Sequence, residues 1–425
     1  MTLARKTISV IGLGYVGLPT AATFASRGIA VVGVDIREEA VARVNAGAAH
    51  FIEPDLDALL RRVVASGHLR ATTAPEPADA FLIAVPTPIR HDRTADLSAV
   101  RAALASLAPV LKRGDLVVIE STCPVGTTAK AAQLLRDLRP DLSFPDTAPE
   151  ASDVLLAYSP ERILPGQTLR ELVDNPRTYG GLDHRSAVAA RDLYAAFATG
   201  PNRLTSAPEA ELSKLVENAY RDVNCAFANE LSLVCDAFGL DVWSVIGLAN
   251  LHPRVDILSP GAGVGGHCIP VDPWFIHEAL PERTPLIRAA REVNDNKPLF
   301  VAGRIAEAAS RFEAPAIAVL GLAYKPNVDD LRESPALRIA RELAASETGR
   351  LLIVEPHVRH LPPDLAARDG VTLAALDEAL AQADVVAVLV GHDAFRSMDR
   401  SLLDGKAVVD AVGLTPGLAA AAAAA

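Results

Sequence analysis

The sequence predicts an α/β protein in which two parallel-sheet domains are joined by a long central helix. Three observations favour this fold. Short apolar runs alternate with helical stretches through the first 200 residues, a stretch without glycine or proline follows at 209–238, and the alternation restarts at Ala316. Such alternation indicates β-α-β units, whose strands run parallel.

The apolar runs that open the chain define a first domain, expected over residues 1–206. We expect its buried strands at 8–11, 30–34, 81–85, 116–119 and 154–158. The segments between them have the apolar spacing of helices, except for the proline-containing stretch 140–149. Short runs that are apolar throughout are typical of parallel strands covered by helices on both faces.

A central helical and dimerisation region is expected at 207–312. Apolar residues recur there at helical spacing from Leu212 to Ala226, and a glycine-rich loop at 259–273 precedes a second helical stretch. Because the first helix is longer than most helices of globular proteins, we expect it to join two domains. The second domain is expected over 313–425, with strands at 317–320, 351–354, 385–390 and 407–409.

Composition limits the class of protein. The 425 residues are enough for two to three domains of roughly 150 residues each. Half of them are hydrophobic and 22% are charged, which excludes a disordered chain. The net charge of -11 disfavours nucleic acid and membrane surfaces as partners. No apolar run reaches the roughly 18 residues that a transmembrane helix needs, and no signal peptide is expected.

Two further features concern the compartment and the end of the chain. Four cysteines without paired spacing indicate reduced thiols and a cytoplasmic protein. The alanine run from Ala419 to Ala425 is expected to be a frayed tail.

A glycine pattern after the first strand predicts dinucleotide binding. In Gly12-Leu13-Gly14-Tyr15-Val16-Gly17 the first glycine permits a tight turn, the second admits a pyrophosphate, and the third lets helix and strand pack closely. Asp35 ends the second strand, 18 residues after Gly17, where its carboxylate can bind the adenosine ribose. We therefore expect NAD rather than NADP, although Arg37 stands close by. The alternative is a structural glycine turn.

The most unusual stretch runs from Gly261 to Asp272 and contains a cysteine. Four glycines precede Cys268, so a ligand can approach its thiol closely, and a loop thiolate can act as a nucleophile. The alternative is a packed, inert cysteine. Cys225 and Cys235 fall within the helical pattern and are interpreted as structural, as is Cys123.

Polar residues on the long helix form a stripe. Lys214, Asn218 and Arg221 stand at i, i+4 and i+7, within about 60° of one another around the helix. Such a stripe is either a solvated face or a set of ligand contacts. Lys214 could stabilise an oxyanion or a thiolate, or transfer a proton.

Further polar residues follow predicted strands, at the edge where ligands bind such sheets. Thr87 follows one strand, Thr122 follows the next, and Glu161 and Arg162 follow a third. The second domain lacks the glycine pattern, but its loop 321–326 carries Lys325, either for an anionic group or as a solvated lysine.

Together these motifs resemble the UDP-glucose/GDP-mannose dehydrogenase family, from about Ile8 to Pro356. The stretch 159–166 (Ser-Pro-Glu-Arg-Ile-Leu-Pro-Gly) is similar to the UDP-N-acetylhexosamine branch. The stretches 217–224, 263–274 and 325–335 are similar to the enzymes of that branch that oxidise UDP-N-acetyl-D-mannosamine. The resemblance implies two Rossmann-like domains, the first for NAD and the second for the UDP-sugar, in a homodimer.

The resemblance also implies a reaction and its residues. Carbon 6 of the sugar is oxidised twice by NAD, and Cys268 holds the intermediate as a thiohemiacetal and then a thioester. The implied catalytic residues are Cys268, Lys214, Asn218, Thr122, Glu161 and Asp272. The implied cofactor residues are Gly12, Gly14, Tyr15, Val16, Gly17, Asp35, Thr87, Thr122 and Arg332. The implied substrate residues are Glu161, Arg162, Ile163, Lys214, Asn218, Arg221, His252, Arg254, Gly265 and Lys325.

The sequence is also compatible with other functions. The neighbouring possibility is a UDP-N-acetylglucosamine or UDP-glucose 6-dehydrogenase. Val271 stands where UDP-glucose enzymes carry a lysine, which favours the N-acetyl branch. A two-electron hydroxyacid dehydrogenase would need no cysteine, and a nucleotide-sensing module would bind NAD without turnover.

Overall fold

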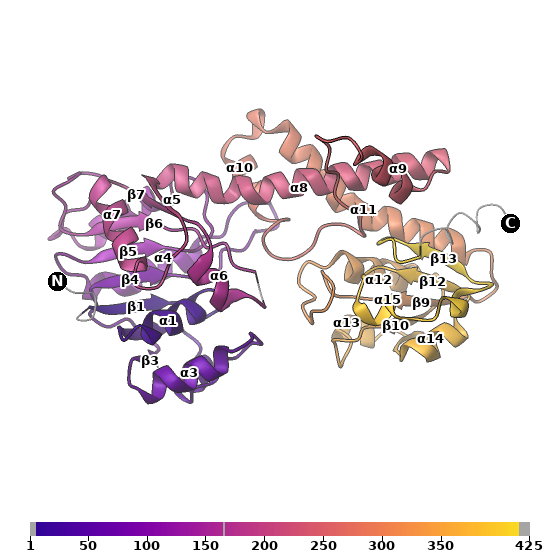
Figure 1. The fold of residues 1–425 in the computed structure, drawn as a ribbon, viewed down its shortest axis with the longest axis horizontal. Coiled ribbons are helices and arrows are strands. Elements are labelled where there is room, and N and C mark those ends of the chain that lie inside the picture. The colour runs from indigo at the N-terminus through magenta and orange to yellow at the C-terminus, as the bar shows by residue number, and fades with distance from the viewer. Residues whose placement is uncertain (1–5, 165, 416–425) are drawn as a thin grey trace. The chain divides into compact units, whose positions relative to one another are not determined.

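The computed structural model describes residues 6–164 and 166–415, so the alanine run from Ala419 lies outside the described residues. The chain divides into two compact units, Met1–Val216 and Glu217–Ala425. The division falls inside one long helix, α8 (Ala207–Phe238), which is labelled in Figure 1. No helix within 6–164 or 166–415 is long and apolar enough to cross a membrane.

The first unit contains an eight-stranded sheet of order β3-β2-β1-β4-β5-β6-β7-β8. Its strands are β1 (Thr7–Ile11), β2 (Ala30–Val34), β3 (Leu69–Thr72), β4 (Ala80–Ile83), β5 (Leu116–Ile119), β6 (Leu155–Tyr158), β7 (Arg177–Gly181) and β8 (Asn202–Ser206). Its helices are α1 (Gly17–Ser26), α2 (Glu38–Asn45), α3 (Leu56–Ala65), α4 (Ser98–Leu107), η2 (Ala108–Val110), α5 (Thr127–Leu138), α6 (Thr168–Asp174) and α7 (His184–Tyr194). The first six strands have the order of a doubly wound dinucleotide-binding sheet.

The predicted α/β class is confirmed, with differences at the edges of the sheet. The five expected strands are present, although β4 ends at Ile83 rather than at residue 85, ahead of Pro86. Strands β3, β7 and β8 were not predicted, because their sequences are short and mix polar residues or glycines with apolar ones. The sheet is also not wholly parallel, since β7 pairs with β6 in the antiparallel direction.

The second unit contains a five-stranded parallel sheet of order β11-β10-β9-β12-β13. Its strands are β9 (Ala316–Leu320), β10 (Arg350–Val354), β11 (Val371–Leu373), β12 (Val385–Val388) and β13 (Ala407–Asp410). Besides α8, its helices are α9 (Val242–Ala249), α10 (Asp272–Ala279), η3 (Pro281–Arg283), α11 (Pro285–Ala309), α12 (Pro335–Ala345), α13 (Pro363–Ala366), α14 (Leu376–Gln382), α15 (Asp393–Arg396) and η4 (Arg400–Leu403).

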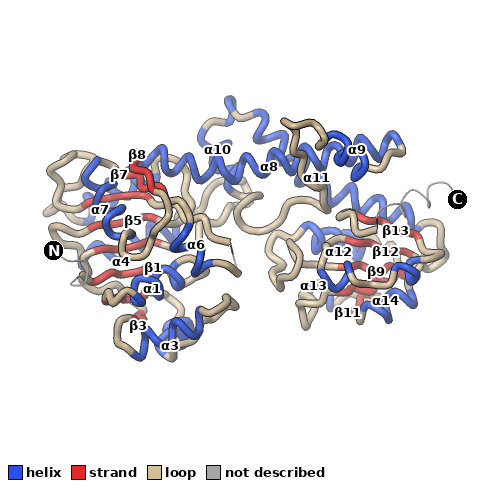
Figure 2. The backbone as a smooth tube through the Cα atoms, in the orientation of Figure 1, coloured by secondary structure: helices blue, strands red, loops and turns tan. Residues whose placement is uncertain are grey.

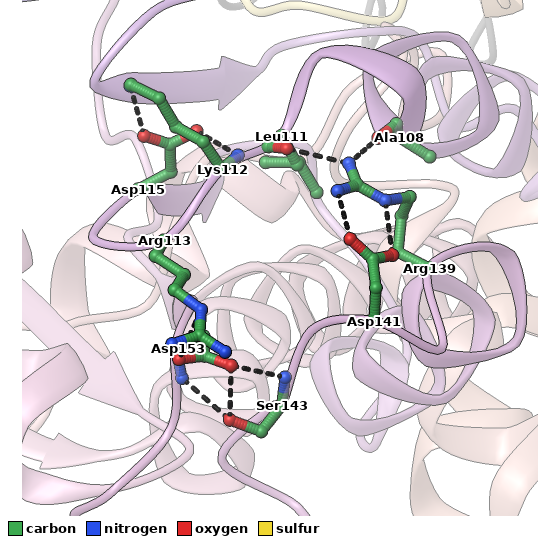
Figure 3. A network of polar contacts seen from close by, with 9 residues as sticks. All are labelled: Ala108, Leu111, Lys112, Arg113, Asp115, Arg139, Asp141, Ser143 and Asp153. Carbon is green, nitrogen blue, oxygen red and sulfur yellow. Dashed lines mark hydrogen bonds and ion pairs between the residues drawn. The ribbon is translucent and has the colours of Figure 1, made fainter.

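The central strands of both sheets are buried on their two faces, as their apolar sequences predict. Alternate residues of β1 show this: Val10 packs in a core cluster with residues of α1, and Ile11 packs in another with residues of α4 and α5. Figure 2 shows the strands of each unit as a layer with helices around it. Opposite the ligand edge, a polar network that includes Lys112 and Asp115 closes the turn before β5 (Figure 3).

The two units repeat the same first crossover. Gly12 directly follows β1 and Gly321 directly follows β9. Their φ values are 95° and 96°, which a residue with a side chain rarely adopts. The N–H of Gly12 donates to the carbonyl of Val34 at 2.8 Å, and that of Gly321 donates to Val354 at 2.9 Å.

An acidic residue completes the repeat in each unit. Asp35 follows β2 and accepts the N–H of Leu13 at 3.1 Å. Glu355 follows β10 and accepts the N–H of Leu322 at 2.7 Å. The architectural similarity that the sequence suggested is therefore present in the backbone and in one side-chain contact.

A buried polar layer joins α8 to α11 in the second unit. Arg291 donates to Asp222 at 2.5 Å, and Asn294 donates to the same oxygen at 2.8 Å. Asn229 donates to Asn294 at 2.9 Å and accepts the N–H of Gly261 at 2.9 Å. Two helices and the start of the glycine-rich loop are therefore held by one chain of hydrogen bonds.

Replacing Arg291 with methionine should destabilise the protein by about 3–5 kcal/mol, because it leaves the buried carboxylate of Asp222 without its cation. The free energy of unfolding in urea measures the effect. The double variant Arg291→Met/Asp222→Leu should recover most of the loss, and a double variant no more stable than the single one would contradict this account.

Candidate functional site

The loop after β1 has the geometry that a dinucleotide needs. A Cβ added to Gly12 would lie 2.5 Å from the carbonyl oxygen of Ala84, and one on Gly17 would lie 1.9 Å from that of Gly12. A Cβ on Gly14 would meet no protein atom within 4 Å. Gly12 and Gly17 are therefore required by the fold, whereas the space at Gly14 suits a ligand. Helix α1 begins at Gly17 and directs its first N–H groups to this loop.

Asp35 directly follows β2, and its carboxylate accepts several hydrogen bonds. Besides Leu13, the backbone N–H of Arg37 donates to it at 3.0 Å and Nε of Arg37 donates at 3.1 Å. Burial alone would raise the pKa of Asp35, but the bonds from Arg37 and Leu13 lower it overall. An ionised acceptor at this position favours NAD, and Arg37 is held by that acceptor rather than directed to a 2′-phosphate.

Two threonines follow neighbouring strands of the first sheet. Thr87 follows β4 and Thr122 follows β5, and both are half-buried. The hydroxyl of Ser121 donates to the carbonyl of Val85 at 2.7 Å, which ties the two loops together. The residues predicted at this ligand edge are thus brought together within one unit.

Glu161, which follows β6, is buried in an ion pair. One of its carboxylate oxygens accepts Nη2 of Arg177 at 2.5 Å and the other accepts the N–H of Arg162 at 2.8 Å. Ile163 packs against the apolar core, and Pro165 of the same motif lies outside the described residues. The carboxylate therefore has no oxygen without a donor.

A second carboxyl group lies next to this pair. Glu120, at the end of β5, is buried and accepts the hydroxyl of Tyr194 from α7. Burial, together with the charge of Glu161, raises the pKa of Glu120 to about 7. No pattern in the sequence predicted a role for Glu120 or Tyr194. Nothing in the spacing of residues 120, 177 and 194 indicates that they meet.

Cys268 lies in the loop before α10 and is half-buried. Its carbonyl oxygen accepts the N–H of Asp272 at 2.9 Å, which connects the cysteine loop to the start of α10. Cβ atoms on Gly265 and Gly266 would lie 2.9 Å and 3.0 Å from the side chain of Tyr324. These two glycines therefore let the cysteine loop pack against the loop that carries Lys325.

Asn218 and Asp272 meet beside this loop. Nδ2 of Asn218 on α8 donates to the carboxylate of Asp272 at 2.5 Å, and both side chains are buried. Lys214 stands one helical turn before Asn218 on α8 and is half-buried. The predicted stripe is therefore only partly solvated, although Arg221 is exposed.

Three other predicted residues lie on exposed segments of the second unit. His252 and Arg254 follow α9, and the N–H of Arg254 donates to the ring of His252 at 3.3 Å. Arg332 is held by the carboxylate of Asp330 at 2.6 Å.

Cys123 is fully buried in a core cluster, as its structural interpretation predicts. No metal-binding group of acids, histidines and cysteines occurs in the described part of the chain.

Comparison with known protein families matches the chain almost throughout. Residues 6–198 match the NAD binding domain of the UDP-glucose/GDP-mannose dehydrogenase family, residues 208–296 match its central domain, and residues 318–416 match its UDP binding domain.

Individual relatives extend this similarity to full length. The chain is 54% identical to an NDP-N-acetyl-D-galactosaminuronic acid dehydrogenase of Ralstonia nicotianae, over 96% of each chain. It is 51% identical to the UDP-N-acetyl-D-mannosamine dehydrogenase of Escherichia coli K12, over 97% of this chain and 100% of that one. The structure of a UDP-D-ManNAc dehydrogenase from Pyrococcus horikoshii has 40% identity and a TM-score of 0.87, covering 97% of this chain and 96% of that chain.

The glycine loop fits NAD, and the similarity to dehydrogenases covers both units. The chain therefore belongs to the UDP-glucose/GDP-mannose dehydrogenase family and is an NAD-dependent nucleotide-sugar dehydrogenase.

Proposed function

We propose that the enzyme oxidises UDP-N-acetyl-D-mannosamine at carbon 6 to UDP-N-acetyl-D-mannosaminuronate. The observation that carries this proposal is the full-length similarity to a dehydrogenase named for that substrate, combined with a thiol in a glycine-rich loop. The balanced reaction consumes one alcohol, one water and two NAD⁺, and gives one carboxylate, two NADH and three protons.

The first oxidation needs a bound cofactor and a proton acceptor. We propose that residues 1–206 bind NAD through the loop at 12–17, Asp35, Thr87 and Thr122, with Arg332 near the cofactor. When bound, NAD accepts the hydride that leaves carbon 6. Lys214 on α8 takes the hydroxyl proton or stabilises the oxyanion, with Asn218 beside it.

Cys268 holds the aldehyde between the two oxidations. Its thiolate adds to carbon 6 and gives a thiohemiacetal, which cannot diffuse away as a free aldehyde would. The second oxidation removes hydride from the same carbon and leaves a thioester. The half-buried thiol and the glycines before it support this role, because carbon 6 must come within bonding distance of sulfur.

Hydrolysis of the thioester completes the reaction. Water attacks the acyl carbon, the C–S bond breaks, and the thiolate of Cys268 is regenerated. We propose that Thr122, Glu161 and Asp272 orient this water and receive its proton. The bond from Asn218 to Asp272 supports this arrangement, since it fixes one carboxylate next to the cysteine loop.

The remaining predicted residues are proposed to bind the sugar nucleotide. Residues 313–425 would hold the UDP moiety, with Lys325 at its phosphates. The contacts to the sugar nucleotide would come from Glu161, Arg162, Ile163, Lys214, Asn218, Arg221, His252, Arg254 and Gly265.

A second candidate substrate is an N-acetyl-D-galactosamine nucleotide. The relative from Ralstonia nicotianae is 54% identical to this chain, compared with 51% for the mannosamine enzyme of Escherichia coli K12. UDP-N-acetylglucosamine and UDP-glucose could undergo the same chemistry and belong in the same substrate panel.

We also propose a cytoplasmic homodimer. Large apolar side chains are exposed along α8, among them Tyr220, Phe227, Val234 and Phe238, which recur at intervals of seven, seven and four residues. This spacing gathers them on one face of the helix, and covering such a face favours association. The requirement for a reduced Cys268 supports a cytoplasmic location.

A panel of UDP-hexoses identifies the substrate. UDP-N-acetyl-D-mannosamine should give the highest kcat/KM, and two NADH should form for each sugar consumed. Highest activity on the galactosamine epimer would shift the assignment to the second candidate. One NADH with release of free aldehyde would contradict the thioester route.

Replacement of Cys268 with alanine should lower acid formation by about 10³-fold or more, because the aldehyde has no thiol to hold it. Binding of the UDP-sugar, measured by calorimetry, should change little. Cys225→Ala is the matched control, since this half-buried cysteine lies on α8 and should leave turnover intact. Full activity of the Cys268 variant would remove that residue from the mechanism.

Two glycines of the first loop should respond differently to alanine. Gly14→Ala should preserve the melting temperature but weaken NAD binding by about ten-fold or more, because its methyl group enters the space proposed for the pyrophosphate. Gly12→Ala should destabilise the fold itself by about 2–3 kcal/mol, owing to its positive φ and the close contact with Ala84. Equal NAD affinity in Gly14→Ala and wild type would refute the assignment of this space.

A further inference from the structure

Two buried carboxyl groups share one buried guanidinium in the first unit. Glu120 follows β5, Glu161 follows β6, and Arg177 opens β7. All three residues are buried, with relative exposures of 4%, 8% and 4%. Such groups are costly in a protein interior unless each charge has a partner, so their charges must be considered together.

The observed contacts pair Arg177 with only one of the carboxyl groups. Nη2 of Arg177 donates to Glu161 at 2.5 Å, whereas its Nε and Nη1 have no hydrogen-bond partner among the described residues. Glu120 accepts Tyr194 on one oxygen, and its other oxygen has no partner in the part of the chain described. Glu120 is therefore the group that carries no charge when the cluster is neutral.

Tyr194 lies between the two halves of this cluster. The guanidinium carbon of Arg177 is 4.8 Å from the centroid of the Tyr194 ring, and the hydroxyl of that ring donates to Glu120. The open Nε and Nη1 groups of Arg177 could serve a second carboxylate if one formed. Arg177 lies over the ring and Glu120 binds its hydroxyl, so a shift of the guanidinium from Glu161 toward Glu120 would exchange one acceptor for the other.

We infer that Glu120 is a positioning residue that controls Glu161. When Glu120 is neutral, Arg177 stays bound to Glu161. When Glu120 is ionised, it attracts the guanidinium of Arg177 and frees Glu161 to accept a proton from the attacking water. The inference rests on the role proposed for Glu161 in hydrolysis. Both oxygens of Glu161 are bonded while Arg177 is in place, and release of Arg177 leaves one of them open to a proton.

The direction of the pH dependence follows from these charges. Burial and the charge of Glu161 raise the pKa of Glu120 to about 7, while Tyr194 and Arg177 lower it. Among the described residues, the other titratable groups whose charges act on the cluster are Tyr194 itself and Tyr179 on β7. Burial raises the pKa of Tyr179 to about 12 and that of Tyr194 well above 10, so both remain neutral. Ionisation of Glu120 should therefore raise hydrolytic turnover as pH increases through about 7.

The test combines spectroscopy with kinetics on the full-length enzyme. Infrared spectra of the wild type should show the carbonyl band of a buried carboxylic acid at pH 6 that is lost by pH 8, and Glu120→Gln should lack this band. The variant should match the wild-type kcat at pH 6 and fall about ten-fold below it at pH 8, with KM changed less than two-fold. The Tyr194→Phe variant should move the midpoint of the carboxyl titration and of the kcat profile to higher pH by about one unit, because Glu120 loses the bond that favours its charged form.

The Asp115→Asn variant is the control. Asp115 is a buried carboxyl residue directly before β5, at the opposite end of the strand from Glu120, and is paired with Lys112. Its variant should retain both the band and the wild-type pH profile. Should Glu120→Gln fail to fold, the midpoint shift in Tyr194→Phe decides the matter.

Each failure has a distinct meaning. A wild-type enzyme without a titrating carboxyl band, or with an unchanged midpoint in Tyr194→Phe, would overturn the inference. A titrating band would still overturn the control of Glu161 by Glu120 if the ratio of wild-type kcat to Glu120→Gln kcat were the same at pH 6 and pH 8. Activity on a different sugar of the panel would refute only the proposed substrate, and the same profiles would then be recorded with that sugar.

Discussion

Loops of the candidate site depend on one kind of interaction: a buried side-chain oxygen accepts backbone N–H groups where the loop begins or turns. Glu211 of α8 accepts the N–H groups of Gly126 and Thr128, which follow β5. Glu53 accepts those of Gly166 and Thr168, beyond β6. Because unpaired backbone groups are costly when buried, these acceptors fix the course of each loop. The chemistry can therefore be carried by loops that remain well defined.

The sequence predicted the centre of each sheet better than its edges. Runs such as Leu116–Ile119 are apolar throughout, which is typical of a strand covered on both sides. Strand β8 has the sequence Asn-Arg-Leu-Thr-Ser and is largely exposed, so no periodicity marks it. The antiparallel direction of β7 depends on the course of the chain around α6, which local patterns do not specify.

Residues of the site were predictable where spacing along the chain carries the signal. The glycine pattern and Asp35 are separated by a fixed crossover, so their meeting could be expected, and the stripe of Lys214 and Asn218 follows from helical geometry. The Glu120–Tyr194–Arg177 cluster was not predictable. Its members come from distant parts of the chain, and only the packed fold brings the Tyr194 hydroxyl to Glu120 and the Arg177 guanidinium over the Tyr194 ring.

The repeated crossover bears on how an acidic residue after a second strand is interpreted. Asp35 and Glu355 make the same backbone contact, yet Ala323 replaces the glycine at the position of Gly14. In both units the acid braces the turn, and only the first unit has the methyl-free position that suits a pyrophosphate. An acid at the end of a second strand can therefore serve as a brace alone, and it becomes evidence for a dinucleotide only together with the glycine.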